Sequence, residues 1–155
     1  MKYLGHLPTD DPFYEYLRCD ILPTLRAVDH PDFRVYGLRA SNHVYLYEER
    51  HSGARVIGKF FGGVPDIDPD AGLRHMEHEF NNLNYLRSIG FNAYPHYVAR
   101  PLGRNASLNR VVVEEFCYGT LFKHVILQAI RENVRDILFQ KLTALAYFLA
   151  TLHNR

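Results

Sequence analysis

The first half of the chain alternates short β-type runs with tight polar turns, and this pattern constrains the fold most strongly. Two runs rich in β-branched and aromatic residues, 33–40 and 43–50, flank the dipeptide Ser41–Asn42. Asn tolerates a positive φ, which suits a hairpin turn at this point. A third run of the same kind, 54–61, follows the next turn. We therefore expect three antiparallel strands joined as a meander.

The hydrophobic period changes on both sides of this meander. Apolar residues at helical spacing predict helices, and further β-rich runs bounded by turn residues predict two more strands. Five strands that carry one inserted helix predict an α+β fold with a mostly antiparallel sheet. The expected elements outside the meander are helices over 11–27, 71–89, 121–131 and 134–153 and strands over 95–103 and 109–117.

Composition excludes several classes of protein. The 155 residues are enough for one domain core, and 18 basic against 17 acidic residues leave a formal net charge of +1. That balance lacks the basic excess typical of nucleic-acid modules. No apolar run reaches the ~18 residues of a membrane span, and the start lacks a secretory signal. Cys19 and Cys117 form no C-x-x-C pattern, so we expect reduced thiols in a cytoplasmic protein.

A lysine and a glutamate suited to an ion pair occur on the third strand and on the helix that follows. The run V-I-G-K places Lys59 near the end of that strand. Glu79 lies about 50° from the centre of the helix's apolar stripe, against about 110° for Glu77. A carboxylate that faces a sheet requires a cation, and Lys59 is the obvious candidate. The alternative is that Lys59 points outward from an edge strand and discourages pairing there.

These residues and the element order resemble the N-terminal lobe of the protein-kinase-like fold. More narrowly, they resemble the aminoglycoside/choline phosphotransferase family, over residues 33–153. The resemblance implies that Lys59 contacts the α- and β-phosphates of a nucleotide. It also implies that Glu79, followed four residues later by Leu83, holds this lysine in place. A carboxylate fixes the direction of a flexible lysine before the phosphates arrive.

The resemblance extends to other cofactor-binding residues. It implies that Ser41 and Asn42 lie in a hairpin over the phosphates and that Ile57 lies on the adenine face. The edge of the base would pair with the backbone carbonyl of Glu115 and the backbone amide of Cys117. The implied cofactor is ATP or GTP with Mg²⁺, and the acceptor is a small molecule that the sequence does not identify.

Two positions depart from the family pattern. Arg39 and Ala40 stand where the phosphate-covering hairpin commonly has glycines. Glu114 stands where the back of the adenine pocket is usually apolar. Three explanations remain open for Glu114: an offset of one residue in the alignment, a polar-lined pocket, or a site that no longer binds ATP.

The resemblance also predicts how the chain is organised. Residues 1–32 would form an N-terminal helical extension, 33–118 a kinase-like N-lobe, and 119–155 the first helices of a C-lobe. The family's catalytic loop, with its general-base Asp and metal-binding Asn, has no counterpart here, so we expect the chain alone to be inactive. The apolar stripe of the last helix predicts contact with a C-lobe or with a second copy of the chain.

Other functions remain as alternatives. A non-catalytic binding or regulatory domain with a similar sheet is the main alternative to a phosphotransferase. An unrelated α+β domain, in which Lys59 and Glu79 form a structural ion pair, is another. The helix also carries H-M-E-H, but His75 and His78 lack a third placed ligand, so we expect solvated side chains and no metal site.

Overall fold

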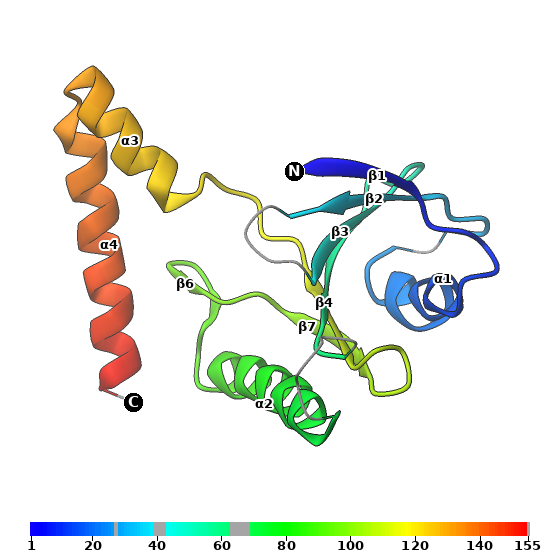
Figure 1. Cartoon of the computed structure of the whole chain (residues 1–155). Helices are drawn as coiled ribbons and strands as arrows, with labels where there is room; N and C mark the ends of the chain where they lie inside the picture. The colour runs from blue at the N-terminus through cyan, green and yellow to red at the C-terminus, as the bar shows by residue number, and fades with distance from the viewer. Residues whose placement is uncertain (27, 39–42, 63–68, 155) are drawn as a thin grey trace. The chain divides into compact units, whose positions relative to one another are not determined.

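The chain forms a mixed α+β structure built around an antiparallel sheet (Figure 1). The computed structural model describes residues 1–26, 28–38, 43–62 and 69–154. It divides into two compact units, Met1–Phe116 and Cys117–Arg155. Over the described residues there are four α-helices, a six-stranded sheet and a separate two-stranded ribbon. The α+β class and the antiparallel sheet confirm the sequence prediction, whereas the predicted strand count of five is wrong.

All neighbouring strands of the main sheet are antiparallel, in the order β1-β2-β3-β4-β8-β7. The predicted meander is present as β2, β3 and β4, which pair in sequence order. Strand β8 lies between β4 and β7 and therefore occupies an interior position. The strands are β1 Lys2–His6, β2 Phe33–Gly37, β3 Val44–Glu49, β4 Arg55–Phe60, β7 Pro101–Asn105 and β8 Val111–Glu115.

The sixth strand, β1, is the one that the sequence analysis missed. Its sequence KYLGH has no β-branched residue, and four of its five residues are exposed. It belongs to the sheet through its pairing with β2 alone, at the edge. The predicted strand over 95–103 is also divided, because β5 (Asn92–Ala93) and β6 (His96–Tyr97) form the separate ribbon before β7 begins.

A short helical segment covers one face of the sheet. Helix α1 (Pro12–Tyr16) is capped by Asp11, whose carboxylate accepts a hydrogen bond of 2.8 Å from the amide of Phe13. One π turn and one 3₁₀ turn follow, so the helix predicted over 11–27 is broken into shorter pieces. The side chains that form the main core here are Phe13, Tyr14, Leu17, Ile21, Leu22, Phe33, Tyr47, Val56, Val111 and Val113.

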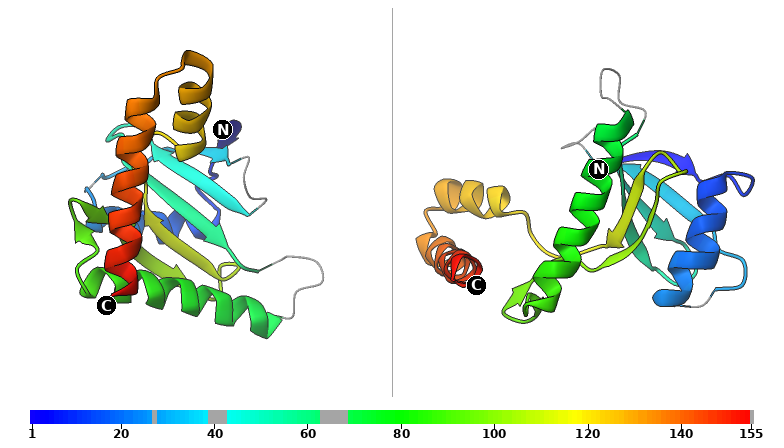
Figure 2. Two further views of the ribbon diagram at one scale, coloured as in Figure 1. Left: turned by 90° about the vertical axis from the view of Figure 1, so that its left-hand side faces the viewer. Right: turned by 90° about the horizontal axis from the view of Figure 1, so that it is seen from below.

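The inserted helix α2 (Pro69–Ser88) lies on the opposite face of the sheet, against β7 and β8 (Figure 2). Met76 anchors it, with only 1% of its surface exposed. Phe80 is half-buried, and the guanidinium of Arg104 lies 4.7 Å from its ring centre. Met76 is therefore the buried centre of the apolar face of α2, while Leu73, one turn earlier, is exposed.

The second unit consists of two helices that contact each other, α3 (Phe122–Glu132) and α4 (Arg135–His153). Asn133 adopts a left-handed conformation, with φ of 53°, at the turn between them. Leucines of α4 remain exposed, at 41% for Leu142 and 43% for Leu149. Contact of this helix with a C-lobe or a second copy remains a prediction. No helix in the described part of the chain is long and apolar enough to cross a membrane.

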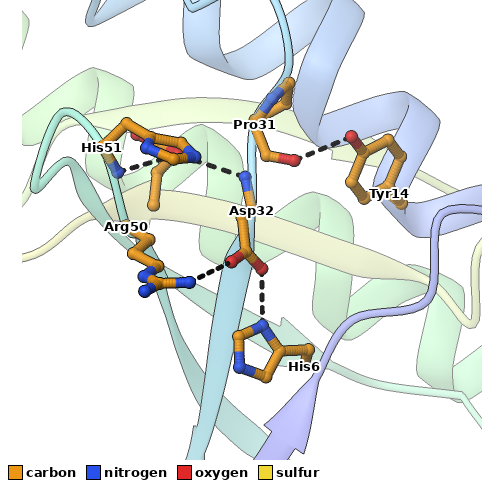
Figure 3. A network of polar contacts seen from close by, with 7 residues as sticks. His6, Tyr14, Pro31, Asp32, Arg50 and His51 are labelled. Carbon is orange, nitrogen blue, oxygen red and sulfur yellow. Dashed lines mark hydrogen bonds and ion pairs between the residues drawn. The ribbon is translucent and has the colours of Figure 1, made fainter.

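Polar contacts at one end of the sheet tie β1 and α1 to the start of β2 (Figure 3). The carboxylate of Asp32 lies 2.5 Å from Nδ1 of His6 and 3.5 Å from Nη1 of Arg50. The hydroxyl of Tyr14 donates a hydrogen bond of 2.8 Å to the carbonyl of Pro31. The contact between His6 and Asp32 ties the end of the edge strand β1 to the start of β2.

Glu49 is the most buried charged residue of this region, with 0% of its surface exposed. Its carboxylate accepts hydrogen bonds from the amides of Asp32 and His51, both at 3.1 Å, and from the amide and hydroxyl of Ser52, both at 2.6 Å. Burial raises the pKa of Glu49, but these hydrogen bonds outweigh burial and lower the pKa from 4.5 to about 2. The carboxylate thus organises the turn between β3 and β4.

We expect Glu49→Gln to destabilise the protein by about 3 kcal/mol near neutral pH. Because the folded-state pKa is depressed, the carboxylate stabilises the fold above about pH 4.5, and this stabilisation is lost as the pH falls toward 2. Urea unfolding of wild type and variant should therefore converge at low pH. Glu132→Gln, an exposed change on α3, should stay within about 0.5 kcal/mol throughout. If Glu49→Gln were destabilised by the same free energy of unfolding at neutral and at low pH, the depressed pKa of Glu49 would be wrong.

Packing of α2 on the sheet gives a second prediction. Met76→Ala should cost about 2–5 kcal/mol in free energy of unfolding, because it leaves a cavity under the helix. Leu73→Ala, one turn earlier and 39% exposed, should cost less than about 1 kcal/mol. Denaturant unfolding of both variants checks this, and equal losses would show that Met76 does not anchor the helix.

Candidate functional site

Strand register determines which side chains share a face of the sheet with Lys59. Ile57 and Lys59 are two residues apart on β4, so they point to the same side. Ile57 lies directly opposite Leu46 on β3 and Glu114 on β8. Residues directly opposite each other share a face, so all four belong to one face of the sheet. This is the face that α2 partly covers.

Lys59 lies between two carboxylates on that face. Its Nζ is 2.7 Å from Oε1 of Glu79 on α2 and also 2.7 Å from Oε1 of Glu114 on β8. The predicted ion pair with Glu79 is therefore confirmed. The edge-strand alternative is wrong, because β4 is paired on both sides and the lysine points toward α2. We call Lys59, Glu79 and Glu114 the lysine triad.

Burial differs strongly within the lysine triad. The exposed fraction of the side chain is 8% for Glu114, 28% for Lys59 and 36% for Glu79. Burial alone would lower the pKa of Lys59, but the hydrogen bonds to Glu114 and Glu79 outweigh it and raise the pKa. Burial raises the pKa of Glu114, and the Lys59 ammonium only partly opposes that rise. Lys59 is thus a firmly charged cation shared by two acids.

Glu115 and Cys117, the residues of the predicted hinge, lie on either side of the boundary between the two units. The Glu115 carboxylate accepts hydrogen bonds from the Tyr97 hydroxyl and, at 2.6 Å, from the Arg100 amide. It also lies 3.8 Å from Nη1 of Arg87 at the end of α2. The side chain of Glu115 therefore fixes the β5–β6 ribbon, a role that the sequence analysis missed. Backbone contacts of Glu115 and Cys117 with a base remain a prediction.

The remaining predicted residues divide into two groups. Ile57 is buried beside the lysine triad, with 9% of its surface exposed. Ser41 and Asn42 lie outside the described residues, as do Arg39 and Ala40. The structure therefore brings together three members of the proposed site, Ile57, Lys59 and Glu79, and adds Glu114 to them.

Two side chains of the H-M-E-H segment on α2 contact other residues. The Glu77 carboxylate accepts a hydrogen bond from Arg104 on β7, and the ring of His78 lies 2.8 Å from the amide nitrogen of Asn82. Among the described residues, no three His, Cys, Asp or Glu side chains are grouped so that they could hold a metal ion. We therefore assign no metal ligand within these residues.

A pocket of about 330 Å³ lies on the other face of the sheet, away from the lysine triad. Phe13, Tyr47 and Phe60 line it, and their rings pack edge to face with centres 5.0 and 5.3 Å apart. This packing belongs to the main core and brings no cation into the pocket. We therefore place the candidate site at the lysine triad, where a half-buried cation meets one buried and one more exposed carboxylate.

No protein-family model, curated protein or solved structure matches the chain significantly.

The lysine triad predicts how stability responds to loss of its cation. Lys59→Met should destabilise the protein by about 3 kcal/mol, because it leaves the buried Glu114 carboxylate without a counter-charge. The double variant Lys59→Met/Glu114→Gln should recover most of that loss, because the buried charge is removed. Urea unfolding of both variants and of the single variant Glu114→Gln gives a double-mutant cycle, which measures the coupling energy between Lys59 and Glu114. If Lys59→Met were as stable as wild type, the ammonium would not be compensating Glu114.

Proposed function

We propose that the sheet face carrying the lysine triad binds the triphosphate of ATP or GTP. In this proposal the chain is the nucleotide-binding N-terminal portion of a small-molecule phosphotransferase similar to the aminoglycoside/choline family. The observation that carries the proposal is the 2.7 Å contact between Nζ of Lys59 and Oε1 of Glu79. Kinase-like enzymes require the same kind of ion pair, between a strand lysine and a helix glutamate, to position nucleotide phosphates.

The physical chemistry of the pair supports phosphate binding. Lysine is a compact point charge on a flexible stem, so its ammonium must be oriented before it can bind a phosphate efficiently. Glu79 supplies that orientation from a helix anchored by Met76. The raised pKa of Lys59 keeps the ammonium charged at the pH of a cell. A phosphate oxygen would then receive a charge-assisted hydrogen bond.

The other contacts with the nucleotide follow from the resemblance. The base would lie near Ile57, which precedes Lys59 by two residues on the same face. Its edge would pair with the backbone of Glu115 and Cys117, and Ser41 and Asn42 would lie over the phosphates. Mg²⁺ would neutralise charge on the phosphates during transfer. The described residues offer no group of side chains that fits this ion, so no step is assigned through it.

One observation favours the alternative of a non-catalytic binding domain. Glu114 forms an ion pair with the same lysine that a nucleotide phosphate would contact. Its Oε1 lies 2.7 Å from Nζ of Lys59, as close as Oε1 of Glu79. In a domain without a phosphate ligand, this contact would be a permanent structural ion pair. The two functions differ in one measurable respect, which is whether phosphate anions compete for Lys59.

The test is ligand-dependent thermal stability of the whole chain with ATP–Mg²⁺ and with GTP–Mg²⁺. A ligand that binds only the folded state stabilises it by RT ln(1 + [L]/Kd), so about 1 mM nucleotide should raise the melting temperature. Lys59→Met/Glu114→Gln should lose this response, because the cation is gone and no buried charge remains. Lys123→Met, an exposed change on α3, is the matched control and should keep the response.

Two results would contradict the proposed function. One is no response to either nucleotide in both wild type and Glu114→Gln. The other is an equal response of Glu114→Gln and Lys59→Met/Glu114→Gln, which would place the nucleotide away from Lys59.

A further inference from the structure

The two carboxylates of the lysine triad differ in the element that carries them and in how deeply they are buried. Glu79 projects from α2, and its side chain is 36% exposed. Glu114 lies on the interior strand β8, and its side chain is 8% exposed. Orienting one ammonium requires only one fixed carboxylate, and Glu79 provides it. The contact between Lys59 and Glu114 therefore needs a separate explanation.

Charge balance limits what can approach Lys59. When all three groups are ionised, one ammonium and two carboxylates give the lysine triad a net charge of −1. Three arginines on the neighbouring elements pair with other acceptors. Arg55 pairs with Glu48 at 2.5 Å, Arg104 pairs with Glu77, and Arg87 donates to the Val98 carbonyl at 2.7 Å.

An ammonium has three N–H donors, and the carboxylates of Glu79 and Glu114 accept two of them. A phosphate bound to the remaining donor would lie close to both carboxylates. Repulsion between like charges is strong where water is scarce, and Glu114 is the more buried of the two acids. Phosphate binding should therefore favour a geometry in which Lys59 moves away from Glu114 and keeps Glu79. The raised pKa of Glu114 fits a carboxylate that a shared ammonium satisfies only in part.

We propose that Glu114 competes with the phosphate ligand for Lys59 and thereby sets the affinity of the site for phosphate anions. Glu79 is then the positioning residue of the site, and Glu114 is its internal competitor. This inference rests on the proposed function, because it concerns the same lysine, and it adds the element that regulates binding there. It also assigns opposite roles to two glutamates that are equally distant from one ammonium.

Two substitutions that keep the size of the side chain test the inference. Glu114→Gln should lower the Kd for ATP–Mg²⁺ by about tenfold or more, because it removes the competing charge and the local negative excess. Glu79→Gln should raise that Kd, because the ammonium loses the carboxylate that orients it. Isothermal titration calorimetry with ATP–Mg²⁺ and with inorganic tripolyphosphate measures both effects. Tripolyphosphate has no base, so the same change with this probe assigns the effect to the phosphates.

Glu114→Leu should shift the Kd in the same direction as Glu114→Gln, and it provides a second variant if one of them unfolds. Circular dichroism and urea unfolding confirm that each variant is folded before titration. Tight binding by Glu114→Gln with weak or undetectable binding by wild type would support the inference.

Two other results would overturn it, and they are distinguishable. If wild type binds ATP–Mg²⁺ through Lys59 and the Glu114 variants bind no more tightly, the competitor role is wrong and the proposed function stands. If wild type and the Glu114 variants all fail to bind either probe, both proposals fail together.

Discussion

One ammonium held between two carboxylates connects helix α2 to the strands on the face of the sheet that carries the candidate site. Lys59 is the only member of the lysine triad that touches both α2 and β8, through Glu79 and Glu114. Partly buried ion pairs contribute little net stability, because desolvation offsets much of the attraction. Removing one partner is nonetheless costly, because it leaves the other charge uncompensated. The triad therefore joins α2 to β8 through one shared ammonium.

Packing on the opposite face allows this arrangement. Rings of α1 and the central strands meet there, and the centres of Phe13 and Tyr47 are 5.0 Å apart. Gly103 on β7 lets the helical segment approach closely, since a Cβ at this position would lie 2.4 Å from the hydroxyl of Tyr16. The main core lies on this face, whereas the other face combines buried apolar residues such as Met76 with the charged groups of the triad. The main core and the candidate binding site thus lie on opposite faces of the sheet.

Sequence patterns predicted the elements that have strong periodicity. The meander, the inserted helix and the choice of Glu79 over Glu77 all depend on local spacing, and the structure confirms them. Glu77 instead pairs with Arg104, as its position away from the apolar stripe allows. Strand β1 escaped prediction because its stability comes from its neighbour and not from its own residues.

Glu114 shows the limit of reading a site from the sequence alone. The family resemblance places it at the back of a nucleotide pocket, a position that is usually apolar. Its contact with Lys59 depends on β8 lying beside β4, although more than fifty residues separate the two side chains in the chain. The spacing of residues along the sequence does not predict which strands lie side by side. The register places Glu114 opposite Ile57, so its carboxylate shares the lysine's face.

Covalent labelling of lysines by an acyl-phosphate derivative of ATP tests the central claim most directly. Such a reagent transfers its acyl group to amines that lie close to the bound phosphates. The chain's lysines are Lys2, Lys59, Lys123 and Lys141, so peptide mass spectrometry can identify the labelled position without ambiguity. The account predicts labelling of Lys59 that excess ATP suppresses and that Glu114→Gln increases. Labelling confined to the other lysines, or labelling of Lys59 that ATP does not suppress, would contradict it.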